Sequence, residues 1–230
     1  DGNKEAGAHA HFSLGRVSHS PDHRYLSYTI DTTGSELYRL YIKEIATGVV
    51  VDMAVDRVGD VEWALDSKQV FYTKVDAQFR PHDVFLHTLG QPETSDRHIF
   101  GAEVEGDHVQ LSRAESQSYI LISEQDDDSS MVFVVPAQGE CTNVTLVLPR
   151  APGVRQEVHH HRDGYFLVLT NKDGATDFQV LRIEEGELGR SSGVTYIAHR
   201  PGIFIRELLV FTEHLVRLEV EDALQRVVVR

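Results

Sequence analysis

The sequence has a single cysteine, no long apolar run and few basic residues, and each shortage excludes a class of protein. Cys141 alone cannot form an intramolecular disulfide, so we expect a reducing, cytoplasmic location. No apolar run reaches the roughly 18 residues of a transmembrane helix, and the opening residues show no charged-then-apolar signal pattern. The expected protein is therefore water-soluble and has no membrane partner.

Basic residues are outnumbered, with 22 Lys and Arg against 36 Asp and Glu, which gives a formal net charge of -14. This excess argues against a nucleic-acid partner and favours cationic ligands, although it is also typical of a merely soluble surface. With 230 residues, 41% of them hydrophobic, the chain can bury a sizeable core. It is long enough for one all-β domain or two smaller ones.

Residues 17–42 define a unit of three short strands and two turns. A first strand ends at Ser20-Pro21-Asp22, where proline presets φ and aspartate can bond its own backbone. A second strand is predicted at 25–30 and a third at 37–42, separated by the reversal residues 31–34. No helical spacing competes with this interpretation.

The same unit recurs along the chain. Matches to the second strand are spaced by roughly 45 to 50 residues, the repeat length of propeller blades. They lie at 70–73, 119–122, 165–168 and 215–218. Third strands are predicted at 83–89, 131–135, 178–183 and 226–229, and fourth strands at 49–51, 98–100, 144–148 and 194–197.

Four-stranded antiparallel units in series predict an all-β fold, a β-propeller, because radial repetition protects sheet edges. A β-sandwich is the alternative, but it would need no such period. The chain is predicted to hold four blades and part of a fifth, a partial ring of a larger propeller, while residues 1–13 have no clear blade position. The approximate blades are residues 14–56, 57–103, 104–151, 152–200 and 201–230.

Several short motifs, in this order, resemble the propeller of the oligopeptidase B group in the prolyl oligopeptidase family. The resemblance is densest over the first two units, and from about residue 91 it rests mainly on the blade pattern. The motifs are Asp1-Gly2-Asn3, Phe12-Ser13-Leu14-Gly15, Ser20-Pro21-Asp22, Asp31-Thr32-Thr33-Gly34, Ala46-Thr47-Gly48, Val61-Glu62-Trp63-Ala64, Val70-Phe71-Tyr72, Arg80-Pro81 and His87-Thr88-Leu89-Gly90.

The resemblance implies a seven-bladed propeller that caps an α/β-hydrolase domain with a Ser-Asp-His triad. It also implies cleavage of short peptides after Arg or Lys. The hydrolase domain is not among these residues, so it is expected as a partner domain of the same protein. The parent is expected to be a serine-type endopeptidase, and this chain alone is expected to be inactive.

One segment formally matches the nucleophile elbow G-x-S-x-G, namely Gly189-Arg190-Ser191-Ser192-Gly193. That motif needs a strand before the serine and a helix after it. Here a polar stretch precedes the motif and the β-like residues 194–197 follow it. Residues 186–193 are therefore predicted to be a loop, and no catalytic residue is predicted.

Two histidine pairs and one acidic run invite a metal hypothesis. In extended chain, His9 and His11 share one face, as do His159 and His161, but no supporting carboxylate or cysteine stands at ligand spacing. Residues 126–128 are three aspartates that resemble part of a calcium loop but lack its glycine and distal glutamate. No metal and no cofactor is predicted.

Two further sets of residues are candidates for a binding site. Tyr28, Trp63, Phe71 and Tyr72 could stack on a ligand, but their strand positions favour packing between blades. Arg80 and Pro81 lie in a long, irregular connection and are predicted to contact substrate or a partner domain, with an ordinary surface loop as the alternative.

The blade pattern together with the resemblance therefore implies the propeller part of a serine oligopeptidase, which is expected to cover the active site and admit only short peptides. Its negative potential would attract short basic peptides. A free-standing propeller used as a protein-binding scaffold is the alternative. In either case an incomplete ring leaves blade faces unpaired, so the isolated piece is expected to self-associate.

Overall fold

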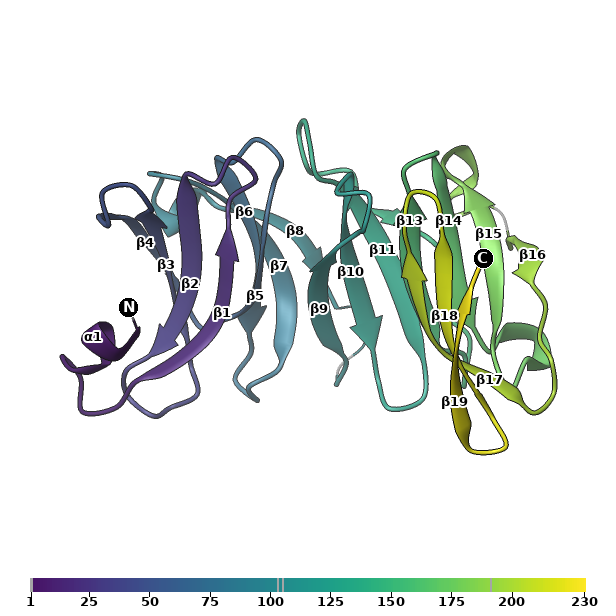
Figure 1. Ribbon diagram of the computed structural model, residues 1–230. Helices are drawn as coiled ribbons and strands as arrows, with labels where there is room; N and C mark the ends of the chain where they lie inside the picture. The colour runs from purple at the N-terminus through teal and green to yellow at the C-terminus, as the bar shows by residue number, and fades with distance from the viewer. Residues whose placement is uncertain (1, 103, 105, 191) are drawn as a thin grey trace. The chain divides into compact units, whose positions relative to one another are not determined.

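The computed structural model describes residues 2–102, 104, 106–190 and 192–230, and it is built from antiparallel sheets (Figure 1). Within these described residues, four sheets have four strands and one has three, and in each sheet neighbouring strands follow the order of the chain. This is the blade topology of a β-propeller. The all-β class and the four-stranded antiparallel unit are confirmed.

The strand bounds are as follows. The first sheet contains β1 (Ser13–His19), β2 (Tyr25–Asp31), β3 (Arg39–Glu44) and β4 (Val50–Asp56). The second contains β5 (Val58–Trp63), β6 (Gln69–Val75), β7 (Pro81–Thr88) and β8 (Arg97–Gly101). The third contains β9 (His108–Arg113), β10 (Tyr119–Gln125), β11 (Ser130–Pro136) and β12 (Thr145–Leu146). The fourth contains β13 (Gln156–His161), β14 (Tyr165–Thr170), β15 (Gln179–Glu184) and β16 (Val194–Ile197), and the fifth β17 (Ile203–Val210), β18 (Leu215–Glu221) and β19 (Leu224–Val229).

Little of the chain is helical. The opening segment contains the short helix α1 (Gly2–Ala6), where Glu5 forms an ion pair with Lys43 of β3 (3.0 Å). Three 3-10 turns lie in connections: η1 (Glu93–Ser95), η2 (Lys172–Gly174) and η3 (Glu185–Glu187). The fourth strand predicted at 144–148 is shorter than expected, since only Thr145–Leu146 is strand, while Val147 and Leu148 are buried in the core.

The first and second sheets contain the same kind of β-bulge. The β1/β2 register shifts between Leu14 and Val17, and there the backbone N–H of Arg16 donates to Thr29 Oγ1 (2.9 Å). Forty-four residues later the N–H of Asp60 donates to Thr73 Oγ1 (2.8 Å), again at a register shift. A Cβ added to Gly15 would lie 2.4 Å from Thr29 Oγ1, and one on Gly59 would lie 2.7 Å from Thr73 Oγ1. Each bulge therefore needs glycine opposite a threonine.

Three connections from second to third strands begin with an aspartate that holds the turn. Asp31 accepts the backbone N–H groups of residues 33, 34 and 36, Asp76 those of residues 78 and 80, and Asp126 those of residues 128 and 129. Hydrogen bonds from the Thr33 N–H and hydroxyl and from the other turn amides lower the pKa of Asp31 to about 2. The carboxylate of Asp126 is therefore used as a turn cap, and it also pairs with Arg150 (2.7 Å).

The chain forms two compact units. One unit comprises Asp1–Ser112 and Pro136–Thr142. It contains the first and second sheets of the chain, which share a core. In it β1 lies beside β5, and the indole N–H of Trp63 donates to Ser27 Oγ (3.0 Å). Trp63, Phe71 and Tyr72 are buried as predicted, but Tyr28 is only partly buried and stacks on Tyr41.

The other unit comprises Arg113–Val135 and Asn143–Arg230. Here β13 lies beside β17, and two apolar clusters fill the space between its sheets. The members with the lowest exposure include Ala114, Phe166, Val168, Val180 and Leu208. The strand that carries the three consecutive histidines, β13, belongs to this unit.

Candidate functional site

The predicted site residues Arg80 and Pro81 lie in a tightly held hairpin connection between β6 and β7. The N–H of Asp76 donates to the carbonyl of Arg80 (2.8 Å), and the Asp76 carboxylate accepts the N–H of Arg80 (2.9 Å) and pairs with its guanidinium (3.4 Å). The guanidinium of Arg57 donates to the carbonyls of Val75 (3.0 Å) and Asp76. Pro81 begins β7. The structure therefore gives Arg80 a role in fixing this loop.

Residues 77–79 of this loop are exposed, and the large apolar one among them is Phe79. Its side chain is 56% exposed, and its backbone is in the left-handed region at φ 64°. That region is strained for a bulky residue. Phe178 has a similar φ of 67°, but its ring packs edge-on against Phe204. Sequence reasoning missed Phe79, because neither its exposure nor its conformation leaves a mark in the strand pattern.

The three histidines of β13 are buried and hydrogen-bonded. His159 pairs through Nδ1 with Glu115 and through Nε2 with Glu157 (3.1 Å). Burial alone would lower the pKa of His159, but the hydrogen bonds to Glu115 and then Glu157 outweigh it and raise the pKa to about 9. His159 and His161 are therefore polar side chains that are buried, because their strand is covered on both faces.

His160 lies between a hydroxyl and a carboxylate. Its Nδ1 is 2.7 Å from Ser116 Oγ and its Nε2 is 2.9 Å from Glu185 Oε1. The ring is buried and packs against Tyr119 (4.7 Å between ring centroids) and Phe166 (4.4 Å). Burial is the main cause that lowers the pKa of His160, although Glu185 opposes it.

The protonation of this set follows from its partners. An ionised carboxylate only accepts, so the Nε2–H of a neutral His160 donates to Glu185 and Nδ1 is left to accept the hydroxyl proton of Ser116. A hydroxyl, an imidazole and a carboxylate in this order form the relay that activates serine nucleophiles. Sequence spacing does not indicate this set, because its three members come from three separate connections and strands.

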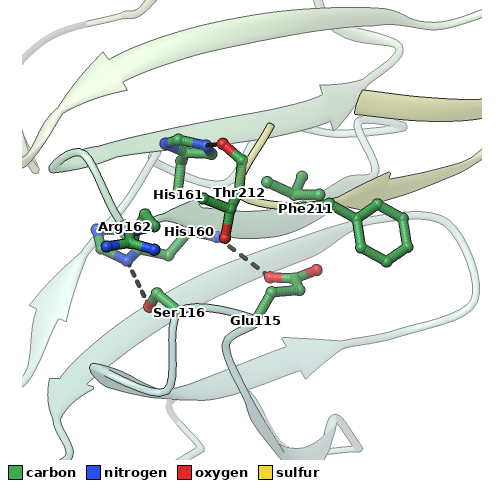
Figure 2. Close-up of a pocket in the computed structure, with 8 residues that line it drawn as sticks. Glu115, Ser116, His160, His161, Arg162, Phe211 and Thr212 are labelled. Carbon is green, nitrogen blue, oxygen red and sulfur yellow. Dashed lines mark hydrogen bonds between the residues drawn. The ribbon is translucent and has the colours of Figure 1, made fainter. Parts of the chain in front are cut away.

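A pocket of about 460 Å³ opens beside this relay (Figure 2). Its wall includes the turn from β17 to β18, where the Nε2–H of His161 donates to the carbonyl of Thr212 (3.1 Å). The lining residues are Glu115, Ser116, His160, His161, Arg162, Val210, Phe211 and Thr212. Ser116 and Arg162 thus share one pocket with the apolar Val210 and Phe211.

The repeat gives no signal for this pairing. Ser116 has the position that Asp66 has in the second sheet, since Ser116 Oγ accepts the N–H of Ser118 (3.1 Å) and Asp66 accepts that of Lys68 (2.8 Å). Ser67, in the same turn as Asp66, contacts the preceding sheet instead, where its Oγ accepts the N–H of Asp22 (3.1 Å). The contact of Ser116 with His160 therefore belongs to this turn and is not copied from the second sheet.

The other motifs singled out from the sequence form no site in the described residues. His9 stacks on Phe12 (6.3 Å), and His11 lies 3.9 Å from Asp31. Over residues 2–102, 104, 106–190 and 192–230, no three His, Cys, Asp or Glu side chains come together so as to hold a metal ion. Ser191 lies outside the described residues, but β16 follows it as a strand.

Within the part of the chain that the structure describes, no helix has the length and apolar character needed to span a membrane.

Comparison with family models matches residues 1–230 to "Prolyl oligopeptidase, N-terminal beta-propeller domain". Among curated proteins, the chain is 29% identical over 209 residues to Protease 2 of Moraxella lacunata, which covers 90% of this chain and 30% of that protein. It is 26% identical over 217 residues to dipeptidyl aminopeptidase BI of Pseudoxanthomonas mexicana, covering 94% and 30%. The chain therefore spans about a third of the length of these relatives.

Two solved structures are similar over the whole chain. Oligopeptidase B from Trypanosoma brucei, in a closed form with covalently bound antipain, superimposes with a TM-score of 0.88 at 26% identity. Oligopeptidase B from Leishmania major gives a TM-score of 0.92 at 22% identity. Each match covers 100% of this chain and 32% of the solved one.

Proposed function

Because the chain belongs to the prolyl oligopeptidase family, as an N-terminal β-propeller domain, we propose that it filters substrates for a serine oligopeptidase. The observation that carries this proposal is the family match over residues 1–230, in a chain that spans only about a third of its relatives. The remaining two thirds would hold the α/β-hydrolase domain and its triad. The blades would be residues 14–56, 57–103, 104–151, 152–200 and 201–230.

The proposed substrates are short peptides cleaved after Arg or Lys. Support comes from the likeness to Protease 2 and to two oligopeptidases B, and from a net charge of -14 that would attract cationic peptides. A size filter follows from a propeller that covers the active site, because a folded protein cannot enter. The free-standing scaffold remains the second candidate, and a hydrolase-like segment downstream of Arg230 in the gene would decide against it.

The size filter is tested on the full-length protein with one cleavage sequence placed in peptides of rising length. We expect kcat/KM to fall steeply once the peptide is longer than the cavity accepts, while the isolated chain cleaves none of them. Equal rates on short peptides and on the same sequence in a folded protein would contradict the filter. If peptides of no length are cleaved after Arg or Lys, the proposed specificity is contradicted, but the size filter is not.

The connection that contains Arg80 and Pro81 is proposed to contact the partner domain through Phe79. A strained backbone costs about 1–3 kcal/mol and persists at functional positions. The hydrogen bonds of Asp76 hold the loop in one shape, so that Phe79 is presented without further loss of entropy on docking.

The contact is tested by replacing Phe79 with the photoreactive p-benzoylphenylalanine in the full-length protein. Illumination is expected to cross-link position 79 to the region outside residues 1–230. Phe211 provides the matched control, since it is exposed to a similar extent (54%) but lies at the turn from β17 to β18. Cross-linking that is no stronger at position 79 than at position 211 would remove Phe79 from the interface.

A further inference from the structure

We propose that Ser116 is an activated nucleophile that accepts acyl groups from small activated carboxylic esters in the pocket of Figure 2. This reactivity is separate from the peptidase activity proposed for the parent protein, because every residue that it needs lies in this chain. The reactive set is Ser116, His160 and Glu185, supported by Arg162 in the pocket wall.

The geometry of the relay places the nucleophile within hydrogen-bond distance of its base. Ser116 Oγ lies 2.7 Å from Nδ1 of His160, within reach for direct proton transfer, and Glu185 holds the opposite nitrogen at 2.9 Å. The imidazole is used in the reverse sense to the familiar triad, in which Nε2 faces the serine. Either nitrogen can accept the proton, since the carboxylate fixes which one carries hydrogen.

The base, His160, is held rigidly by its surroundings. His160 is 2% exposed and packs against the rings of Tyr119 and Phe166, which also contact each other (5.2 Å), so that it cannot turn away from Ser116. Its backbone N–H also lies 3.4 Å from Glu115, which is itself paired with His159. A base that is fixed before substrate arrives loses no further entropy in the reaction.

The pocket beside Ser116 has groups that could bind a small ester. Ser116 and the exposed guanidinium of Arg162 line the same space of about 460 Å³, together with Val210 and Phe211. The apolar pair suits the hydrocarbon or aryl part of a small ester. The cation of Arg162 would stabilise the oxyanion that forms as the carbonyl is attacked.

The proposed reaction is ester hydrolysis, and water is the only reactant that it needs besides the ester. As Ser116 Oγ bonds to the carbonyl carbon, its proton passes to His160 Nδ1, and the C–O bond to the leaving alcohol then breaks as that alcohol takes the proton. A water molecule next attacks the acyl-serine and gives a proton to the same nitrogen. The carbon–Oγ bond breaks, the proton returns to Oγ, and the acid leaves.

The test uses p-nitrophenyl acetate and a fluorophosphonate probe with the longest protein that contains this chain. Peptide mass spectrometry reads the labelled position, so a serine elsewhere does not interfere. We expect label on Ser116, loss of it in Ser116→Ala, and at least a tenfold slower reaction in His160→Gln and Glu185→Gln. Ser67→Ala is the matched control, since Ser67 occupies the equivalent turn but meets a backbone N–H instead of an imidazole.

The pH dependence separates this role from simple surface reactivity. Glu185, Glu115, His161 and Tyr119 surround His160, and burial lowers its pKa below the ordinary 6.5. The imidazole is therefore neutral at lower pH than a free histidine, and the pH at which labelling falls to half its full rate should lie below 6.5. Near-native circular dichroism in Glu185→Gln guards against misfolding as the cause of any loss.

Three results would overturn the proposal. These are no label on Ser116 in a folded protein, a labelling rate that Glu185→Gln leaves unchanged, and a rate that rises only above pH 8 as for an ordinary hydroxyl.

Discussion

Arg16 and Asp60, 44 residues apart in sequence, form an ion pair of 2.6 Å between β1 and β5. The second oxygen of the same carboxylate accepts the backbone N–H of Leu111 in β9 (3.1 Å). Asp60 therefore joins the first strands of three consecutive sheets. Because such a strand has a sheet partner on one side only, a side chain that bridges to the next sheet replaces hydrogen bonds that the edge would otherwise lack.

Replacing Asp60 by alanine is expected to lower the free energy of unfolding by about 1–3 kcal/mol, the cost of leaving the buried Leu111 N–H unsatisfied. Urea unfolding measures the change. Asp56→Ala is the control, since its pair with Arg39 is exposed and should contribute no more than about 1 kcal/mol. Equal losses in the two variants would show that Asp60 makes no special link.

His87 is completely buried between two carboxylates, with Nδ1 2.8 Å from Asp96 and Nε2 3.1 Å from Asp52. Tyr72 also donates to Asp96 (2.9 Å). Replacing the ring takes a hydrogen-bond partner away from both carboxylates, so His87→Gln should cost about 3–5 kcal/mol.

Urea unfolding checks the His87 prediction by measuring the loss in His87→Gln. His98→Gln, at an exposed pair with Asp83, should be close to neutral. Losses of equal size in the two variants would contradict a structural role for the buried ring.

The His159 pair makes stability depend on pH. Its folded-state pKa of about 9 lies above the unfolded value of 6.5, so its contribution is complete below pH 6.5 and is lost as pH rises through 9. The loss is at most about 3 kcal/mol. Urea unfolding at pH 6 and pH 9.5 should show it, and His159→Gln should remove the difference, whereas the exposed His214→Gln should keep it. A pH-independent wild type would exclude the ion pair.

The negative charge should speed the capture of basic peptides by the full-length protein. Salt screens the attraction between charges beyond roughly 8 Å at physiological ionic strength. The advantage of Arg-rich over neutral peptides in kcat/KM should therefore shrink steeply as the salt concentration rises. Asp127→Asn and Asp128→Asn are suitable charge variants, but Asp126 is not, because it caps its turn. A preference that neither salt nor these variants alter would leave size exclusion as the only role.

The isolated chain should self-associate, because apolar side chains on its outer strands are exposed. Leu14 and Val17 of β1 and Leu224, Val227 and Val229 of β19 are each about half exposed or more. Sedimentation at micromolar concentration should show oligomers, which Val227→Asp with Val229→Asp should weaken. A monomer with cooperative unfolding would argue against unpaired blade faces.

The repeat made the fold predictable, but it did not predict the site. Strands such as Tyr25–Asp31 and Tyr165–Thr170 alternate clearly and follow turn signals, so each could be located from local sequence alone. The burial of His160 depends on Glu185 and Ser116, which lie 25 and 44 residues away. Local alternation cannot identify such partners, because only tertiary packing brings them to the ring.

The aspartates that open the connections after β2, β6 and β10 have a practical consequence for protein engineering. Each connection holds its own first residues in shape through hydrogen bonds that begin and end inside it. A foreign sequence inserted beyond the capped residues would therefore leave the flanking strands in register. The three connections are ready-made display positions, on which new binding loops can be exchanged one at a time.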